Sequence, residues 1–204
     1  ATRNSKSGVG STYVIFGSPS LPSTIDTLNS SFNDGTNGFQ LIGEYASDNS
    51  GVHVASLGDV NADHVDDFAI ASYSYGSTFG RIYVIFGHPG KFPAILDLSS
   101  IQLNDTLGFT VTGTSGGENL GWGISGAGDI NGDGGNDMVF SAYYWNSGTG
   151  RIAMIYGEQS SLIFSPSSSS QPQHQNPHSS SSSTTTTTTT SSESCKQGKQ
   201  FKNT

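Results

Sequence analysis

The sequence repeats itself with a 70-residue period. Residues 13–17 read YVIFG, residues 83–87 read YVIFG again, and residues 153–157 read AMIYG. The same interval relates 38–39 to 108–109, 58–61 to 128–131, and 80–82 to 150–152. Several landmarks that recur in one register indicate a duplicated structural unit, with neighbouring copies packed against each other.

Each unit reads as four short strands. Runs rich in Val, Ile, Phe, Tyr and Ala alternate with clusters of Gly, Asn, Ser and Asp, and apolar residues do not recur at helical spacing. The expected strands are 52–57, 68–73, 81–86 and 109–112, followed by 122–127, 138–143 and 151–156. The run 83–86 is apolar on both faces, which is typical of a strand packed between two neighbouring sheets.

These patterns predict an all-β chain made of β-propeller blades, each a four-stranded antiparallel sheet. Residues 8–158 hold about two blades, whereas a closed propeller needs about 4–8. We therefore expect an incomplete propeller, which is a fragment, a truncated gene product or part of an assembly. The blades at its ends would expose apolar faces, and such faces favour association.

Residues 159–204 form a low-complexity tail rich in Ser, Thr, Pro and Gln. Such a composition buries too little apolar surface to order a chain, so we expect the tail to be disordered. It is compatible with an O-glycosylated stalk and equally with a tail that has no function. The single cysteine, Cys195, excludes an internal disulfide.

Charge limits the possible partners. Residues 8–158 contain 15 acidic and 3 basic side chains, and the whole chain has a formal net charge of -8. A body this acidic repels nucleic acid phosphates and anionic lipid, and it favours cations. We therefore expect no nucleic acid partner. We also expect no membrane span, since no apolar run reaches the ~18 residues that one needs.

Two acidic loops at the same phase of the repeat are the strongest candidates for a site. Each begins with Asp and places oxygen-bearing side chains at positions 1, 3, 5 and 9, with a main-chain carbonyl at position 7. Calcium takes 6–8 such hard oxygen ligands, whereas zinc prefers Cys and His. The expected calcium ligands are Asp59, Asn61, Asp63, Val65 and Asp67 in the first loop and Asp129, Asn131, Asp133, Gly135 and Asp137 in the second.

The loops differ from an EF-hand. Position 12, which carries the last acid of an EF-hand, is Ile70 or Phe140 here, and position 9 leads straight into a strand. We therefore expect a hairpin connection. Position 6 favours a positive φ, which Gly134 adopts freely and His64 does not, so the second loop should bind calcium more tightly. The alternative is that these are ordinary Asp/Asn/Gly turns that bind nothing.

The motifs resemble the FG-GAP repeat of the integrin alpha N-terminal β-propeller. The resemblance covers about residues 8–157 and rests on Gly-Asp-x-Asn-x-Asp, an Asp-led apolar strand, and Gly-Arg-x-Tyr-Val-Ile-Phe-Gly, in that order. It implies calcium in each loop. The repeat also occurs in surface proteins and in the non-catalytic part of a phospholipase D. This chain departs from the family pattern after the second strand, where it has Ala71-Ser72-Tyr73 and the family has Gly-Ala-Pro.

The expected function is a calcium-binding, non-catalytic module that acts outside the cell or at its surface, in adhesion or in recognition of a protein or glycan. Further blades of a longer parent chain are another expected partner. The alternative is an accessory repeat segment of a secreted or surface enzyme. Aromatic residues after the second strand of each unit would serve either inter-blade packing or ligand contact: Tyr73, Tyr75, Tyr143, Tyr144 and Trp145. Acceptor triplets for N-glycosylation begin at Asn29 and Asn104.

Overall fold

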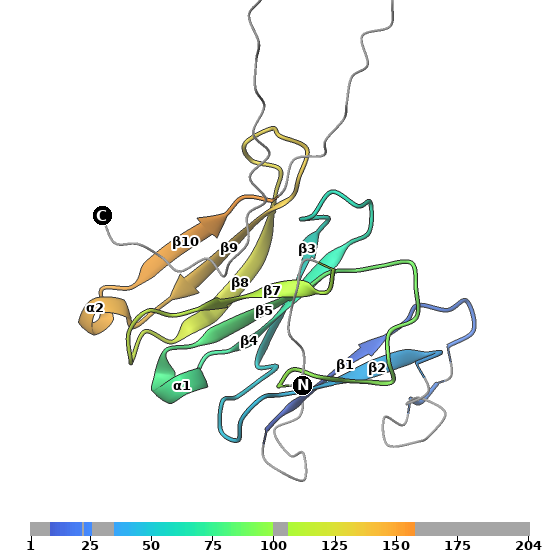
Figure 1. The fold of residues 1–204 in the computed structure, drawn as a ribbon, viewed down its shortest axis with the longest axis horizontal. Coiled ribbons are helices and arrows are strands. Elements are labelled where there is room, and N and C mark those ends of the chain that lie inside the picture. Colours follow the sequence, from blue (N-terminus) through green and yellow to red (C-terminus); the bar gives the residue numbers. More distant parts are fainter. Residues whose placement is uncertain (1–8, 22, 26–34, 100–105, 158–204) are drawn as a thin grey trace, which may run out of the picture. The chain divides into compact units, whose positions relative to one another are not determined.

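The computed structural model describes residues 9–21, 23–25, 35–99 and 106–157, all within one compact unit (Figure 1). They form ten strands in three sheets and two short turns that are labelled as helices. The predicted all-β class is confirmed. The tail 159–204 and the two acceptor asparagines lie outside the described residues.

One sheet contains a complete repeat unit. Its strands are β3 (His53–Gly58), β4 (Asp67–Ser72), β5 (Arg81–Ile85) and β7 (Gly108–Thr112). They lie side by side in the order β3-β4-β5-β7, and each pair is antiparallel. This is the four-stranded antiparallel sheet that the sequence predicts, because four short apolar runs joined by tight turns pair most simply with their neighbours in the chain.

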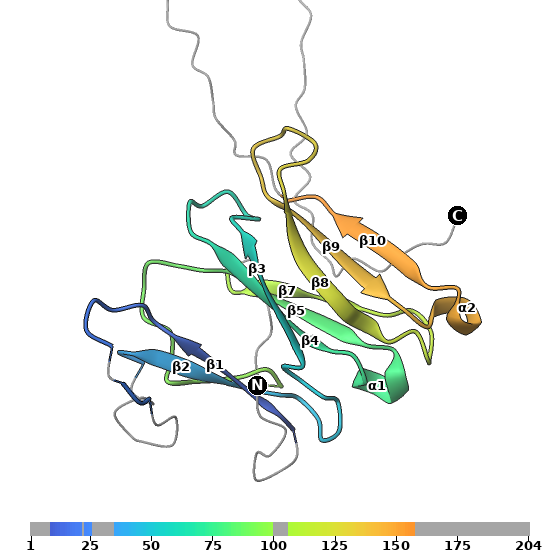
Figure 2. The ribbon, with the colours of Figure 1, turned by 180° about the vertical axis from the view of Figure 1, so that it is seen from behind.

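The other two sheets are partial copies of the same unit. One contains β8 (Leu120–Gly128), β9 (Asp137–Ala142) and β10 (Arg151–Ile155), with β10 at its edge (Figure 2). The other contains β1 (Ser11–Ile15) and β2 (Gly38–Ile42), which are the repeat equivalents of β5 and β7. Its third strand, β6 (Ile95–Asp97), pairs with β2 in parallel. The sequence did not predict β6, since so short a strand has no detectable period.

The apolar side chains of β5 enter two cores. Ile82 and Val84 belong to a cluster shared with β8 and β9, whereas Tyr83 and Ile85 belong to a cluster shared with β2. Successive residues of a strand point to opposite faces. The expectation that this strand packs between two neighbouring sheets is therefore confirmed.

Both labelled helices are single turns of left-handed backbone. In α1 (Tyr75–Thr78), Gly76 and Ser77 have φ values of 61° and 64°. In α2 (Trp145–Gly148), the equivalent Asn146 and Ser147 have φ values of 48° and 59°. A left-handed turn costs L residues energy, yet it recurs at the same position of both units. Among the described residues, no helix is long and apolar enough to cross a bilayer.

Candidate metal-binding loops

The two acidic loops connect adjacent antiparallel strands. The first joins β3 to β4 and the second joins β8 to β9. In both hairpins the strand register shifts just before the loop, between Ser56 and Gly58 and between Gly126 and Gly128. A bulge of this kind bends a strand and re-aims the loop after it. The predicted hairpin connection is confirmed, and strands flank both loops on either side.

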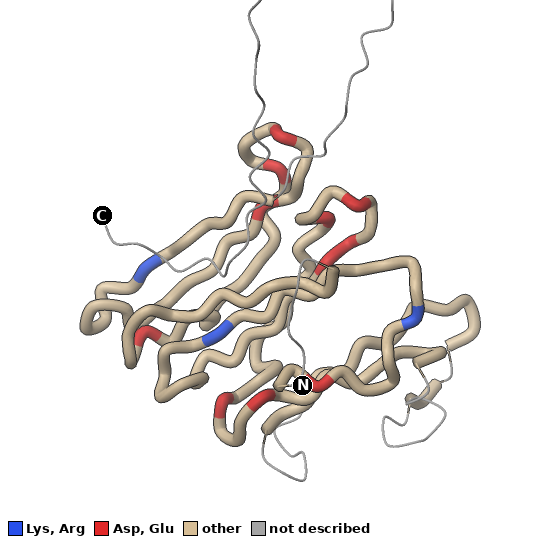
Figure 3. Tube along the Cα trace, in the orientation of Figure 1, with Lys and Arg blue, Asp and Glu red and all other residues tan. Residues whose placement is uncertain are grey.

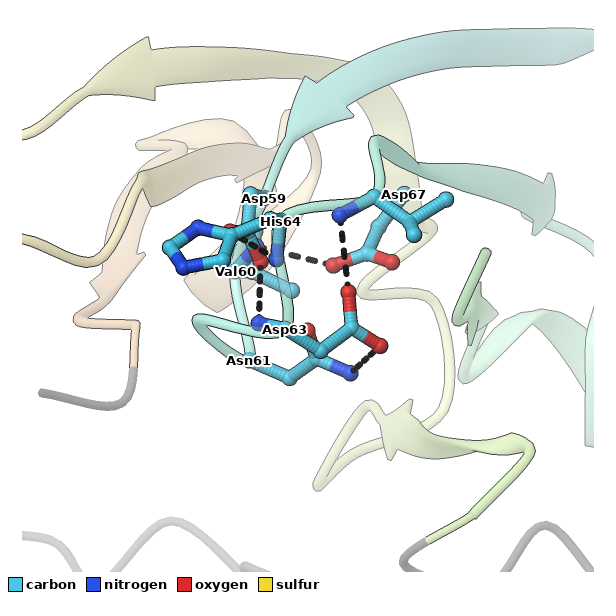
Figure 4. A network of polar contacts seen from close by, with 7 residues as sticks. Asp59, Val60, Asn61, Asp63, His64 and Asp67 are labelled. Atoms are coloured by element: carbon cyan, nitrogen blue, oxygen red, sulfur yellow. Dashed lines mark hydrogen bonds and ion pairs between the residues drawn. The ribbon is translucent and has the colours of Figure 1, made fainter. Parts of the chain in front are cut away.

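The first loop is closed by its own side chains (Figure 4). The Asp59 carboxylate accepts hydrogen bonds from the N–H of Asp63 at 3.0 Å and of His64 at 2.8 Å. The Asn61 amide oxygen accepts from the Asp63 N–H at 3.2 Å, and its amide nitrogen donates to the Asp63 carboxylate at 3.0 Å. The Asp63 carboxylate also accepts from the Val65 N–H at 2.8 Å. The side chains at positions 1, 3 and 5 therefore lie together.

The second loop repeats this network. Asp129 accepts from the N–H of Asp133 at 3.0 Å and of Gly134 at 2.9 Å. Asn131 accepts from Asp133 N–H at 3.1 Å and donates to its carboxylate at 2.8 Å, and Asp133 accepts from Gly135 N–H at 3.0 Å. An additional bond of 2.8 Å joins Gly132 N–H to Asp129. Two different sequences thus reach one geometry because the Asp and Asn residues stand at the same positions.

The ninth-position aspartates have a different place from the other predicted ligands. Asp67 is 1% exposed, and its two carboxylate oxygens accept from the N–H groups of Val60 and Gly87, each at 2.8 Å. Asp137 is 0% exposed and accepts from Ile130 at 2.8 Å and Gly157 at 3.0 Å. Each carboxylate ties its loop to the residues after the third strand of its unit. Sequence reasoning missed this link, and the signal that could have found it is a glycine 20 residues after each aspartate.

Burial dominates the protonation of Asp67. It raises the pKa from 3.8 to about 6, the Asp63 and Asp59 charges act in the same direction, and the N–H groups of Val60 and Gly87 oppose the rise. A carboxylate that is buried near other carboxylates favours its neutral form unless a positive charge arrives. The first loop therefore has an electrostatic reason to accept a cation.

The turn at position 6 has the predicted positive φ in both loops. The φ of His64 is 70° and that of Gly134 is 96°. Position 4 is also left-handed, at 60° in Ala62 and 75° in Gly132. The first loop thus holds two L side chains in a conformation that costs roughly 1–2 kcal/mol per residue, whereas the second uses glycine at both positions.

The two loops touch one another. The N–H of Asn136, in the second loop, donates to the carbonyl oxygen of Asp59 at 2.8 Å. An ideal Cβ on Gly58 would lie 1.8 Å from the Asn136 amide nitrogen, so a larger residue at the base of the first loop would displace that side chain, and the φ of 72° also favours glycine there. The acidic residues of both loops are coloured red in Figure 3. Their contact concentrates negative charge that the sequence places in separate repeat units.

The donors fit a hard cation, but the cage is not preformed. In the part of the chain that the structure describes, no three His, Cys, Asp or Glu side chains are placed to hold a metal ion together. In the first loop the carboxylates of Asp59, Asp63 and Asp67 instead accept backbone N–H groups. Each carboxylate oxygen has more than one lone pair, so these bonds leave acceptor capacity. Side-chain rotation within the loop is needed to bring the oxygens to one ion.

One aromatic residue of each turn packs against an arginine. The Tyr75 ring lies 3.6 Å from the Arg81 guanidinium carbon, and the Trp145 ring lies 5.3 Å from that of Arg151. These two aromatics therefore support the arginine that begins the third strand of each unit, as cation–π partners.

A second aromatic group remains exposed and crosses from one sheet to the next. Trp122 on β8 contacts His53, Tyr73 and Tyr143, with ring centroids 5.7, 5.0 and 4.6 Å apart. Tyr143 in turn contacts Tyr144, and Trp122, Tyr143 and Tyr144 are exposed. These contacts show packing between sheets, while ligand contact by the exposed rings remains a prediction.

The arginine that begins the third strand of each unit forms an ion pair with a glutamate, but the glutamate differs between the units. Glu118 accepts from the N–H of Thr114 and Ser115 and forms an ion pair with Arg151. The equivalent of Glu118 in the first unit is Asp48, which is one methylene shorter. Arg81 pairs there with Glu44 instead, at 2.8 Å. Asp48 is buried, and its Oδ2 atom has no hydrogen-bond partner among the described residues.

Asp48 should make the protein less stable as the pH rises through the weakly acidic range. Burial and the Glu44 charge raise its pKa from 3.8 to about 6, against the opposing effect of Arg81. Because the folded chain binds this proton more tightly than the unfolded chain, the stabilisation is complete below pH ~4 and is lost between pH ~4 and ~6. Asp67 titrates in the same direction. Urea unfolding in EDTA at pH 4, 5, 6 and 7 measures the slope.

The variant Asp48→Asn should raise the stability at pH 7 and reduce this slope, because the amide carries no charge to bury beside Glu44. Asp66→Asn is the matched control, since Asp66 is exposed. An Asp48→Asn protein whose pH profile is the same as that of the wild type would contradict the assignment.

No protein-family model and no curated protein gives a match for this chain. The resemblance to the FG-GAP repeat therefore rests on the repeated motifs of the sequence itself.

Proposed function

We propose that the chain is a calcium-binding module of FG-GAP-type repeats, arranged as blades of a β-propeller, that acts outside the cell in adhesion or in recognition of a protein or glycan. One observation carries the proposal. Two loops at equivalent positions of the repeat hold Asp, Asn and Asp side chains at positions 1, 3 and 5 in the same hydrogen-bonded arrangement, above a buried aspartate at position 9. An ordinary turn requires neither this full set of oxygens nor its repetition.

The residues that would hold calcium are the side chains of Asp59, Asn61, Asp63 and Asp67 with the Val65 carbonyl, and their equivalents in the second loop: Asp129, Asn131, Asp133, Asp137 and Gly135. The ion would neutralise clustered carboxylates and stiffen the hairpins. Each loop must turn its side chains from backbone N–H groups toward the ion, so part of the binding energy offsets this rearrangement. We accordingly expect modest affinity, with a Kd on the order of 10⁻⁴–10⁻³ M, as in other extracellular calcium modules.

Calcium should raise the melting temperature. At 10 mM calcium, a site with a Kd of 10⁻³–10⁻⁴ M adds about 1.4–2.7 kcal/mol to the free energy of unfolding, since the unfolded chain has no assembled site. For a domain of this size each kcal/mol shifts the melting temperature by about 2–4 °C. Scanning fluorimetry across 0–10 mM calcium measures the shift in melting temperature, and a parallel series with the same concentrations of magnesium serves as the comparison.

Paired variants separate the ion from the fold. Asp63→Asn and Asp133→Asn keep an oxygen for the backbone N–H but remove a ligand charge, so the double variant should lose the calcium response while keeping the calcium-free melting temperature. Asp66→Asn should keep the response. Of the two single variants, Asp63→Asn should retain the tighter site, because the second loop is built on glycines. A wild-type melting temperature that calcium leaves unchanged, or an undiminished response in the double variant, would contradict the proposal.

The recognition part of the proposal is supported by the aromatic surface between the sheets. Trp122, Tyr143 and Tyr144 are exposed while their rings touch one another or neighbouring rings. Rigid aromatic side chains provide large contact area at a small cost in conformational entropy. Trp122 on β8 also contacts Tyr73, which follows β4 of the neighbouring sheet, so this surface joins two sheets.

A further inference from the structure

The last strand of the described chain carries exposed apolar side chains where its repeat partner is buried. Ile152 is 76% exposed, Met154 is 40% exposed and Tyr156 is 57% exposed. The equivalent residues of the preceding unit are Ile82, Val84 and Phe86, which are 2%, 0% and 9% exposed. Both strands pair with the strand before them, but β5 also pairs with β7, whereas β10 is the edge strand of its sheet. Among the described residues, these β10 side chains thus lack both a fourth strand beside them and a sheet over them.

The chain itself shows what covers this face in the preceding unit. Ile82, Val84 and Phe86 share one core cluster with Leu120 of β8 and with three residues of β9: Met138, Phe140 and Ala142. Ala153 and Ile155 of β10 pack against this same cluster, so the alternating Ile152 and Met154 point to the opposite face. We call Ile152, Met154 and Tyr156 the tail face. Its counterpart is covered by the apolar face of another sheet.

The first sheet presents the complementary half of such an interface. Val14, Phe16, Phe39 and Leu41 lie on the face of this sheet that joins the core cluster of Tyr83 and Ile85. Because successive residues of a strand alternate between faces, Ile15 and Ile42 lie on the opposite face. Ile15 is 45% exposed, whereas Ile85, its repeat partner, is 2% exposed and lies against the sheet of β2. We call Ile15 and Ile42 the head face.

We propose that the tail face of one molecule docks on the head face of a second copy of this chain. The chain itself contains two contacts of this kind. The sheet of β1 and β2 packs on the sheet of β3, β4, β5 and β7, and that sheet packs on the sheet of β8, β9 and β10. In each contact one sheet contributes the face equivalent to the tail face and the next sheet contributes the face equivalent to the head face. Among the described residues, one unmatched half of that interface remains at each end. A second copy supplies a matching half with Ile15 and Ile42 as its apolar residues. The contact is head-to-tail, so that it builds rings or open chains rather than symmetric pairs.

Sedimentation velocity and light scattering of the full chain test the proposal. The weight-average mass of the wild type should rise above the 21.3 kDa of the monomer to that of a dimer or larger species. The measurement extends to a concentration of about 0.1 mM, where an interface of micromolar Kd is saturated. Runs in EDTA and in calcium keep this result separate from the calcium proposal. A chain that remains monomeric at about 0.1 mM under both conditions would overturn the inference.

Two charge variants determine the polarity of the contact. Ile152→Asp blocks the tail face and Ile15→Asp blocks the head face, and each protein alone should be monomeric. Mixed together they should form a one-to-one dimer, because each retains the half that the other lacks. Tyr45→Asp, at an exposed aromatic residue outside both faces, should associate like the wild type, and circular dichroism checks that all variants fold. Association that survives Ile15→Asp, or a mixture that stays monomeric, would rule out head-to-tail docking.

Discussion

Replacing Asp67 with alanine should lower the free energy of unfolding by about 3 kcal/mol in calcium-free buffer, because hydrogen bonds to a charged group contribute about 1.5–3 kcal/mol each and two are lost. The carboxylate is buried and accepts from Val60 and Gly87 N–H, each at 2.8 Å. Its removal leaves both donors without a partner in the core. The cost of burying the charge offsets part of the loss, which places the expectation at the lower end of the range for two bonds.

Urea unfolding in EDTA measures this effect independently of any metal. Asp137→Ala should behave in the same way in the second unit, where the carboxylate accepts from Ile130 and Gly157. Asp66→Ala removes an exposed carboxylate at the adjacent position and should change the stability by less than ~0.5 kcal/mol. Were Asp67→Ala no more costly than Asp66→Ala without calcium, the aspartate would act only as a metal ligand.

Replacing Gly80 with alanine should be more damaging, at about 4 kcal/mol or more, which is the range of exceptional single substitutions. Gly80 has a φ of 82°, and an ideal Cβ would lie 2.2 Å from the carbonyl oxygen and 2.4 Å from the nitrogen of Leu120. Both atoms belong to the backbone where the next unit begins, and Leu120 N–H donates to the Phe79 carbonyl at 3.1 Å. The added methyl group therefore separates two sheets whose backbones are in direct contact.

The repeat provides a matched control for this substitution. Gly150 is the equivalent glycine of the next unit, with a φ of 73°, but the nearest atom to its ideal Cβ is the Tyr143 carbonyl oxygen at 3.3 Å. Gly150→Ala should thus cost only the left-handed backbone, about 1–2 kcal/mol. Chemical denaturation of both variants gives the difference. Equal losses would show that the close approach to Leu120 contributes nothing to stability.

The local features of the fold could be predicted from the sequence. Short apolar runs bounded by Gly, Asn and Asp determine strands such as β4 and β9, because alternation and turn chemistry act within a few residues. The acidic loops followed from their spacing, and the positive φ at His64 and Gly134 followed from the turn that this spacing requires. Calcium itself, the propeller arrangement and the extracellular role remain predictions.

Other features depend on residues that are distant in the chain. The bond from Asp67 to Gly87 spans 20 residues, and the parallel pairing of β6 with β2 joins segments that β3, β4 and β5 separate in the chain. The first leaves only a repeated Asp–Gly spacing of 20 residues in the sequence, which is too sparse to indicate a contact by itself, and the second is a very short strand with no period. The contact of Asn136 with Asp59, which brings the two loops together, likewise depends on how one sheet packs on the next.

By itself, the sequence determined the strands, the repeated unit and the oxygen-rich loops, since each depends on side chains within one turn or hairpin. Only the tertiary structure decided which copy of a repeated strand is buried. Ile82 and Ile152 occupy equivalent positions, yet one is 2% and the other 76% exposed. The physical reason is that burial is a property of the neighbouring surface: the sheet of β8 and β9 covers the first strand, and no described residue of the chain gives the second the same cover.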